Sequence, residues 1–228
     1  MLVQLVFFVL AACLASFTNL CAYRLGCGQR PWYPRRSYCE SCHHLLTWWQ
    51  LIPIGGYLIQ GGHCCYCHHS LNYWWPLSEA GCGLGMSLLA TGQLHHDLLI
   101  LAWLMGLLFI TTTDGLYQCL YPISLLGLSP LFFLIPNWHW PEKSELILSL
   151  IFLIIISIPT YYYHAMGSGD VMFLTITFIV FGWYWGIVIL LIACLFTLLW
   201  FKVASTRRLP FLPALCFATI LIFIFFNR

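Results

Sequence analysis

Two aspartates stand at the ends of long apolar segments, where a carboxyl group is unusual. Asp114 ends one such segment, and Asp170 begins another, directly after Gly167-Ser168-Gly169. An ionisable side chain at membrane depth is costly and therefore indicates a function. Two carboxyl groups that share one proton can act together on an amide, the ionised one activating water and the protonated one polarising the carbonyl and protonating the leaving nitrogen. We therefore interpret Asp114 and Asp170 as a candidate catalytic pair.

Glycines precede the second aspartate. Gly167 and Gly169 lack a Cβ, which permits an unusual backbone turn and the close approach of a substrate backbone. A structural interpretation of the same tetrapeptide is a helix start, in which Ser168 or Asp170 caps exposed backbone N–H groups. The residues alone leave both interpretations open.

A second group of candidate functional residues lies in the segment from Tyr23 to Trp75. It contains two Cys-x-x-Cys pairs, Cys39 with Cys42 and Cys64 with Cys67. Four thiolates at this spacing can close a tetrahedral structural Zn²⁺ site. Redox-active pairs and unliganded cysteines are the alternatives. Further residues of the segment could replace a ligand, namely Cys65, His43, His44, His63, His68 and His69.

The composition indicates that these groups sit in a polytopic membrane protein. The 228 residues are 61% hydrophobic and only 7% charged, with a mean hydropathy of +0.88, which excludes an ordinary soluble domain. A helix that crosses about 30 Å of hydrocarbon needs about 20 apolar residues. We expect spans at Leu2–Ala22, Leu77–Leu94, Leu98–Thr113, Leu120–Pro136, Leu146–Tyr163, two within Val171–Phe201, and Leu209–Phe226.

The charges decide between one span and two in Val171–Phe201. With a turn near Gly182–Gly186, most basic residues outside the spans fall on one side, as the positive-inside rule expects. These residues are Arg24, Arg30, Arg35, Arg36, Lys202, Arg207 and Arg208, which leaves Lys143 and Arg228 on the other side. We therefore predict an all-α fold of about eight transmembrane helices in the cell membrane, with both termini outside.

This topology places the aspartates. Two spans separate Asp114 from Asp170, so both fall on the cytoplasmic face. Asp97 falls in an outer turn, which excludes it as the catalytic partner. The expected organisation is a first transmembrane helix at residues 1–22, a cytoplasmic zinc-knuckle loop at residues 23–75, and a seven-helix core at residues 76–228. Reduced cysteines persist in the cytoplasm, in agreement with a metal site there.

The chain contains an ordered set of short motifs. They are Ser16-Phe17-x-Asn19, Tyr23-Arg24-Leu25, Ser37-x-Cys39-x-x-Cys42, Trp49-x-x-Ile52-Pro53, Gly62-x-Cys64-x-Tyr66-Cys67, Pro76-x-x-Glu79, Asp114 followed by Gln118 and Pro122, and Gly167-x-Gly169-Asp170. In this order, the motifs resemble those of type IV prepilin peptidases, the GxGD aspartic peptidases, and most closely the competence-type members.

The resemblance implies cleavage of a short leader from prepilin or pseudopilin substrates at the cytoplasmic membrane boundary. It also implies N-methylation of the new amino terminus in many members, with S-adenosylmethionine as the donor. No direct nucleic-acid binding is expected. Two other classes stay open, a membrane thiol-disulfide oxidoreductase that uses the Cys-x-x-Cys pairs and a zinc-stabilised membrane scaffold.

The resemblance also assigns residues. Asp114 and Asp170 match the catalytic aspartates, and the four paired cysteines match the family's four-cysteine motif. Glu79 matches a family acid near the start of the second span, which we interpret as a buried hydrogen-bond partner, with a solvated helix-entry acid as the alternative. Two positions depart from the pattern, since Met172 stands where lysine is common and Pro122 comes one position late.

Overall fold

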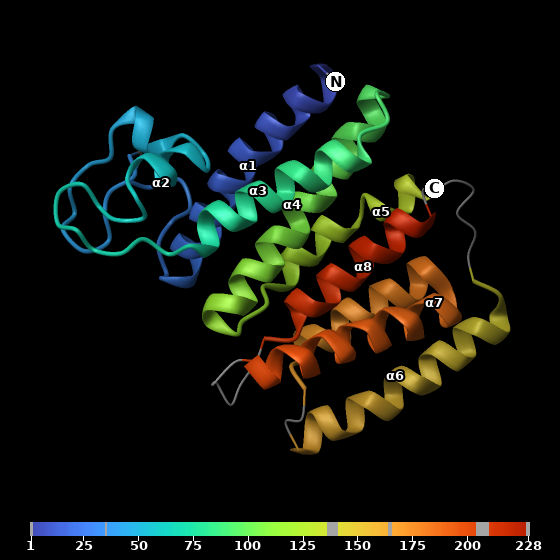
Figure 1. The fold of residues 1–228 in the computed structure, drawn as a ribbon. Coiled ribbons are helices and arrows are strands. Elements are labelled where there is room, and N and C mark those ends of the chain that lie inside the picture. The colour runs from blue at the N-terminus through green and yellow to red at the C-terminus, as the bar shows by residue number, and fades with distance from the viewer. Residues whose placement is uncertain (1, 35, 136–140, 164–165, 204–209, 227–228) are drawn as a thin grey trace. The chain divides into compact units, whose positions relative to one another are not determined.

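The computed structural model describes residues 2–34, 36–135, 141–163, 166–203 and 210–226 (Figure 1). Several residues used in the topology argument lie outside the described residues, namely Arg35, Pro136, Arg207, Arg208, Leu209 and Arg228. The described residues form α-helices and two 3₁₀ helices, and no strand beyond two isolated β-bridges. The elements are α1 (Leu2–Gly26), η1 (Trp48–Leu51), α2 (Gly55–Ile59), α3 (Trp74–Leu89), α4 (Leu94–Tyr117), η2 (Pro122–Leu128), α5 (Leu131–Leu134), α6 (Lys143–Tyr163), α7 (Ser168–Val203) and α8 (Leu212–Phe226).

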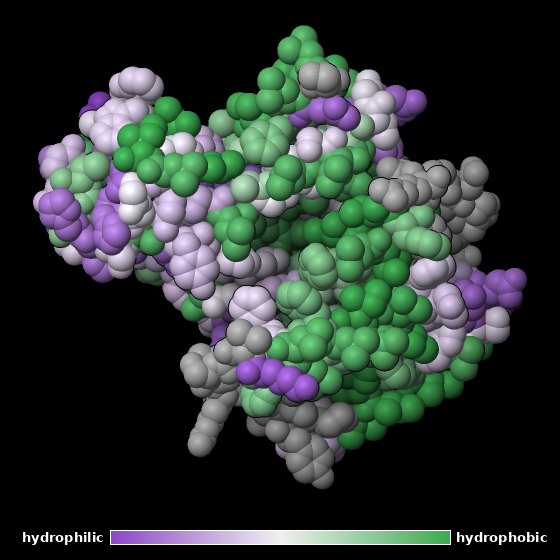
Figure 2. Space-filling view, viewed as in Figure 1, coloured by the Kyte–Doolittle hydropathy of each residue, from purple (hydrophilic) through white to green (hydrophobic). Residues whose placement is uncertain are grey.

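Four helices among the described residues are long and apolar enough to cross a membrane. They are α1, α4, α6 and α7. Figure 2 shows apolar residues over the helices of the visible face, and hydrophilic residues gathered over the cysteine-containing loop between α1 and α3. The prediction of an all-helical membrane protein is thereby confirmed, whereas the count of eight spans stays a prediction.

The segment Leu120–Pro136 differs from the expected continuous span. It forms the 3₁₀ helix η2 and then the four-residue helix α5, with a turn between them. Ser129 and Pro130 have right-handed helical torsions, but Pro130 has no N–H to donate, which interrupts the helical hydrogen bonds there. The apolar helical segment Pro122–Leu134 is therefore shorter than the span expected at Leu120–Pro136.

The second expected span, Leu77–Leu94, is also displaced. The helix α3 begins three residues earlier, at Trp74, and ends at Leu89, whereas Leu94 already belongs to α4. Gly92 has φ +86°, a conformation open to glycine that ends a helix and reverses the chain. The 16 residues of α3 extend about 24 Å.

Helix α7 contains the break that the charge argument predicted. Its 36 residues would make a straight helix about 54 Å long, but Gly182 has non-helical torsions, φ 78° and ψ 177°. Phe178 and Gly186 would be about 12 Å apart along a straight axis, yet a Cβ placed on Gly186 would lie 2.6 Å from the Phe178 ring. The chain therefore doubles back at Gly182, and the two arms of α7 are drawn in orange in Figure 1.

The chain forms two compact units, with the boundary inside α4. Unit 1 comprises residues 1–109, and unit 2 comprises residues 110–228. In unit 1, α1 packs against α3, and Gly83 permits the close approach because a Cβ there would lie 2.8 Å from the Phe8 ring. A buried hydrogen bond of 2.7 Å from Asn19 to Ser78 joins the same two helices. In unit 2, α7 packs against α6, α8 and η2.

Candidate carboxylate site and candidate metal centre

Asp114 and Asp170 line one cavity in unit 2. Asp114 lies in the last turn of α4, and Asp170 lies in the first turn of α7, so both carboxyl groups are carried by helix ends. Both residues are buried, with exposed fractions of 9% and 7%. The cavity has a volume of about 140 Å³ and is lined by Asp114, Gln118, Leu120, Pro122, Gly167, Ser168, Gly169, Asp170, Met172 and Leu212.

The Asp170 carboxyl group is fixed by the turn that precedes it. Its Oδ2 accepts a hydrogen bond from the Gly167 N–H at 3.1 Å, and its own N–H donates to the Gly167 carbonyl at 3.1 Å. An acid in the first turn that reaches back to the N-cap N–H is one half of a capping box. The capping interaction considered for this tetrapeptide is therefore present, and it orients the same carboxyl group that lines the cavity.

The Asp114 carboxyl group is held from a distant part of the chain. Its Oδ2 accepts a hydrogen bond of 3.2 Å from the N–H of Leu212, the first residue of α8. The first N–H groups of a helix have no partner inside the helix and lie at the positive end of its dipole, so they suit a carboxylate. Sequence reasoning missed Leu212. Pro213 indicates that a helix starts here, but it does not indicate that the first N–H of this helix donates to Asp114.

Close packing explains the glycines before Asp170. Neither Gly167 nor Gly169 has a positive φ, so the unusual turn expected of them is absent. A Cβ on Gly169 would lie 2.7 Å from the Leu120 Cβ, and a Cβ on Gly167 would lie 3.2 Å from Asp170 Oδ2. Gly169 thus lets the segment after α4 and the start of α7 approach each other, which brings both aspartates to one cavity.

The four paired cysteines of unit 1 converge on one point. Their sulfur atoms all lie within 4.8 Å of one another, with 3.8 Å between Cys39 and Cys67 and 4.0 Å between Cys42 and Cys64. A tetrahedral Zn²⁺ with Zn–S bonds of about 2.3 Å separates its sulfurs by about 3.8 Å. These four residues could therefore bind a metal ion such as zinc.

Two matching turns present the cysteines. In the first, the Cys39 N–H donates to the His44 carbonyl and the His43 N–H to the Cys39 carbonyl, each at 2.9 Å. The second turn repeats both bonds between Cys64, His69 and His68, also at 2.9 Å. His43 and His68 both have φ 56°. The two Cys-x-x-Cys pairs are thus copies of one backbone motif.

The second turn also prepares a thiolate. Backbone N–H groups of Cys67 and Tyr66 stabilise the charged sulfur of Cys64 and lower its pKa to about 6. A thiolate is the form that binds a metal ion. Two of the other potential ligands have different contacts. The His44 ring packs on Tyr66 at 3.6 Å between centroids, and His63 Nδ1 lies 2.8 Å from the Gly61 carbonyl.

Glu79 and Asp97 are buried acids of unit 1 with local partners. Glu79 accepts a 2.7 Å hydrogen bond from the N–H of Ile54, a residue with φ 60°. Asp97 accepts hydrogen bonds from the Thr91 N–H at 2.8 Å, the Thr91 hydroxyl at 3.0 Å and the Gly92 N–H at 3.0 Å. Asp97 therefore stabilises the turn between α3 and α4, and Glu79 stabilises the turn before α2.

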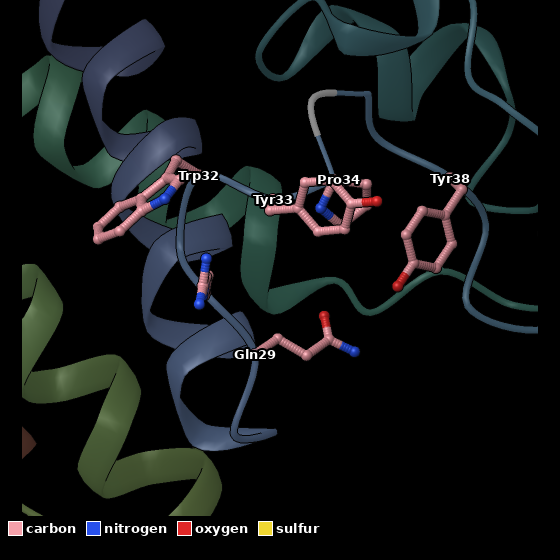
Figure 3. Close-up of a pocket in the computed structure, with 6 residues that line it drawn as sticks. Gln29, Trp32, Tyr33, Pro34 and Tyr38 are labelled. Carbon is pink, nitrogen blue, oxygen red and sulfur yellow. The ribbon is translucent and has the colours of Figure 1, made fainter.

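A wider cavity of about 600 Å³ lies in the segment after α1 (Figure 3). In Figure 3, the side chains of Gln29, Tyr33 and Tyr38 face a common space. Trp32 and Tyr33 are 73% and 68% exposed, which suits aromatic residues at a water–lipid boundary. The lining residues are Gln29, Arg30, Trp32, Tyr33, Pro34 and Tyr38, and none of these is an acid or a nucleophilic thiol.

Comparison with known proteins gives one match. No curated protein and no solved structure matches this chain. The matched segment contains the four clustered cysteines and Glu79, and it ends before Asp97 and Asp114. Residues 9–92 match the family model of the Bacterial Peptidase A24 N-terminal domain.

Proposed function

We propose that this protein is an integral membrane aspartic endopeptidase that removes the leader of type IV prepilin-like proteins. The observation that carries the proposal is the meeting of Asp114 and Asp170, from the ends of two helices, in one cavity. The match of residues 9–92 to a bacterial peptidase A24 domain supports a prepilin peptidase function in general.

The geometry suits hydrolysis without a covalent intermediate. The hydrogen bonds from Leu212 and Gly167 hold one oxygen of each carboxyl group, which fixes how the two groups face the cavity. Among the described residues, no lysine or arginine lines the cavity. Two neighbouring carboxyl groups then share one proton, which supplies a base for the water and an acid for the scissile amide.

The position of the cavity at helix ends supports this choice of substrate. A transmembrane helix has its backbone groups already hydrogen-bonded, so a peptidase must act where the chain is extended, at the junction of leader and apolar stem. We place this junction at the cytoplasmic face, with both termini of the enzyme outside. N-methylation of the new amino terminus by S-adenosylmethionine is a second activity that we include in the proposal and test separately.

The four cysteines have a structural part in this proposal. Cys39, Cys42, Cys64 and Cys67 hold Zn²⁺, which closes the loop between α1 and α3 and takes no part in the hydrolysis. A site with four protein ligands leaves the metal no open position for water or substrate. The chemistry is assigned entirely to the carboxylate pair.

Asparagine variants test the proposal. Purified Asp114→Asn and Asp170→Asn are incubated with a prepilin-like protein, and the products are read by mass spectrometry. Both variants should fold and should cleave the substrate about 10²- to 10⁴-fold more slowly, because an amide can neither share the proton nor activate water. Asp97→Asn is the matched control and should cleave normally. Normal processing by both Asp114→Asn and Asp170→Asn would refute the proposal.

The same measurement separates the second activity. The wild-type reaction is run with and without S-adenosylmethionine, and the mass of the cleaved product is compared. Cleavage in both reactions, with an added methyl group only when the donor is present, is the expected result. If the product never gains a methyl group, the proposed methyltransferase activity is refuted and the proposed peptidase activity is unaffected.

A further inference from the structure

Gln118 lies in the carboxylate cavity without an assigned role. It follows the last residue of α4 and lines the cavity together with Asp114 and Asp170. Its side chain is exposed, and no hydrogen bond joins its carboxamide to another residue in the part of the chain that the structure describes. A donor and an acceptor thus stand beside the two acids and are available to a ligand.

The backbone of Gln118 is strained. Its φ is +50°, and its N–H donates to the Asp114 carbonyl at 2.9 Å. This is the left-handed arrangement that ends a helix, and the residue in that position is usually glycine and sometimes asparagine. Any other side chain crowds its own backbone there. Strained residues of this kind are costly to the fold and cluster at functional sites.

The other strained residues are accounted for by turns. Four described non-glycine residues have a positive φ, namely His43, Ile54, His68 and Gln118. His43 and His68 occupy equivalent positions in the two cysteine turns, and Ile54 donates its N–H to the buried Glu79. A turn alone would be served better by glycine at position 118, so the glutamine side chain needs a separate explanation.

We propose that Gln118 binds the backbone of the peptide substrate through its carboxamide, an inference that rests on the proposed function. The carboxamide can donate to a peptide carbonyl and accept from a peptide N–H, which matches an extended chain whose backbone groups have left their helix. It is also uncharged. The carboxamide therefore adds no charge to the cavity that holds the two aspartates.

Gln118→Gly separates the side chain from the turn. Glycine adopts a positive φ without strain, so the variant should fold with an unchanged or higher melting temperature. Its kcat/KM for a prepilin-like peptide should fall roughly 10-fold, mostly through KM, since about one hydrogen-bonding group to the substrate is lost. Gln118→Asn keeps the amide and tolerates the left-handed conformation, so its kcat/KM should lie between those of the wild type and Gln118→Gly.

Binding without turnover decides the role. The dissociation constant of the uncut peptide is measured for Asp170→Asn and for Asp170→Asn combined with Gln118→Gly, in the full-length protein. The combined variant should bind roughly 10-fold more weakly. A wild-type kcat/KM in Gln118→Gly, or an unchanged dissociation constant, would show that Gln118 only ends the helix and would overturn the inference. Cleavage by Asp170→Asn at the wild-type rate would instead count against the peptidase proposal.

Discussion

The cysteine cluster is assembled by local backbone turns, whereas the carboxylate pair is assembled by the packing of helices that are distant in sequence. The four cysteines of unit 1 come from two copies of one turn within a single loop, and each turn is fixed by its own backbone hydrogen bonds. The two aspartates of unit 2 come from different helices, and Asp114 is held by an N–H that lies 98 residues away in sequence. The first site is local in sequence, and the second exists only in the packed helices.

The difference between the two sites has an energetic consequence. A local turn motif closed by a metal ion can form whenever the metal is present, because little chain has to be ordered to complete it. A site built from helix ends depends on every packing contact that sets the helix positions. Damage to the first site should therefore be repaired by metal, whereas damage to the second should follow from packing changes such as an added methyl group.

The largest effect is expected from loss of the metal. Structural Zn²⁺ sites in isolated peptides contribute on the order of 10 kcal/mol, so Cys64→Ser or a strong chelator should unfold the loop between α1 and α3. Metal analysis should give about one zinc per chain for the wild type and much less for Cys64→Ser, and limited proteolysis should cut within residues 27–73.

The neighbouring thiol is the control. Cys65 is exposed and lies outside the cluster, so Cys65→Ser should keep its zinc and its resistance to proteolysis. Wild-type protein with far less than one equivalent of zinc, or equal loss in Cys65→Ser and Cys64→Ser, would argue against a site made by these four sulfurs.

The next effect is on catalysis. General acid and base groups contribute about 10²- to 10⁴-fold to a rate, so Asp114→Asn and Asp170→Asn should each lower kcat by that amount. Because the two carboxyl groups act as one unit, the double variant should be scarcely slower than either single variant. The measurement is kcat on a prepilin-like peptide for all three variants, and strictly multiplicative losses would mean that the aspartates act independently.

A single methyl group should disturb the carboxylate site. A Cβ on Gly169 would lie 2.7 Å from the Leu120 Cβ, so Gly169→Ala forces the start of α7 away from the segment after α4. Overpacking of this kind lowers the free energy of unfolding by about 1–3 kcal/mol, and the displaced Asp170 should slow cleavage as well.

Gly115 offers the comparison for that variant. It lies beside Asp114 in α4, and a Cβ placed there has no neighbour within 4 Å. Gly115→Ala should therefore raise the helix stability by about 0.5–1 kcal/mol and leave cleavage unchanged. Melting temperatures and cleavage rates of both variants check the pair, and equal effects from Gly169→Ala and Gly115→Ala would show that close packing at Gly169 is unimportant.

The smallest effect is expected at the third aspartate. Asp97 accepts three hydrogen bonds in the turn before α4, and an amide in its place loses the charge that strengthens them. Asp97→Asn should lower the free energy of unfolding by about 1 kcal/mol and leave kcat unchanged. Thermal unfolding and a cleavage assay on one preparation measure both, and a large loss of activity would show that Asp97 is more than a turn acid.

The helix break in α7 and the interrupted segment after α4 show where sequence reasoning succeeded and where it failed. Charge balance predicted a reversal near Gly182, and the structure has non-helical torsions there. Hydropathy predicted a continuous helix at Leu120–Pro136, where the structure has the 3₁₀ helix η2 followed by the short α-helix α5. Hydropathy reports compatibility with lipid, but it does not report that Pro130 lacks the N–H that a continuous α-helix needs at this position.

The sequence by itself determined the membrane environment, the helical class and the grouping of four cysteines, because composition and short-range spacing act locally. Only the tertiary structure decided that Asp114 and Asp170 line one cavity, that Leu212 donates to the first of them, and that Gly169 is needed for its contact with Leu120. Those relations depend on how helices distant in sequence pack, and packing distances are not encoded in any single stretch of the chain.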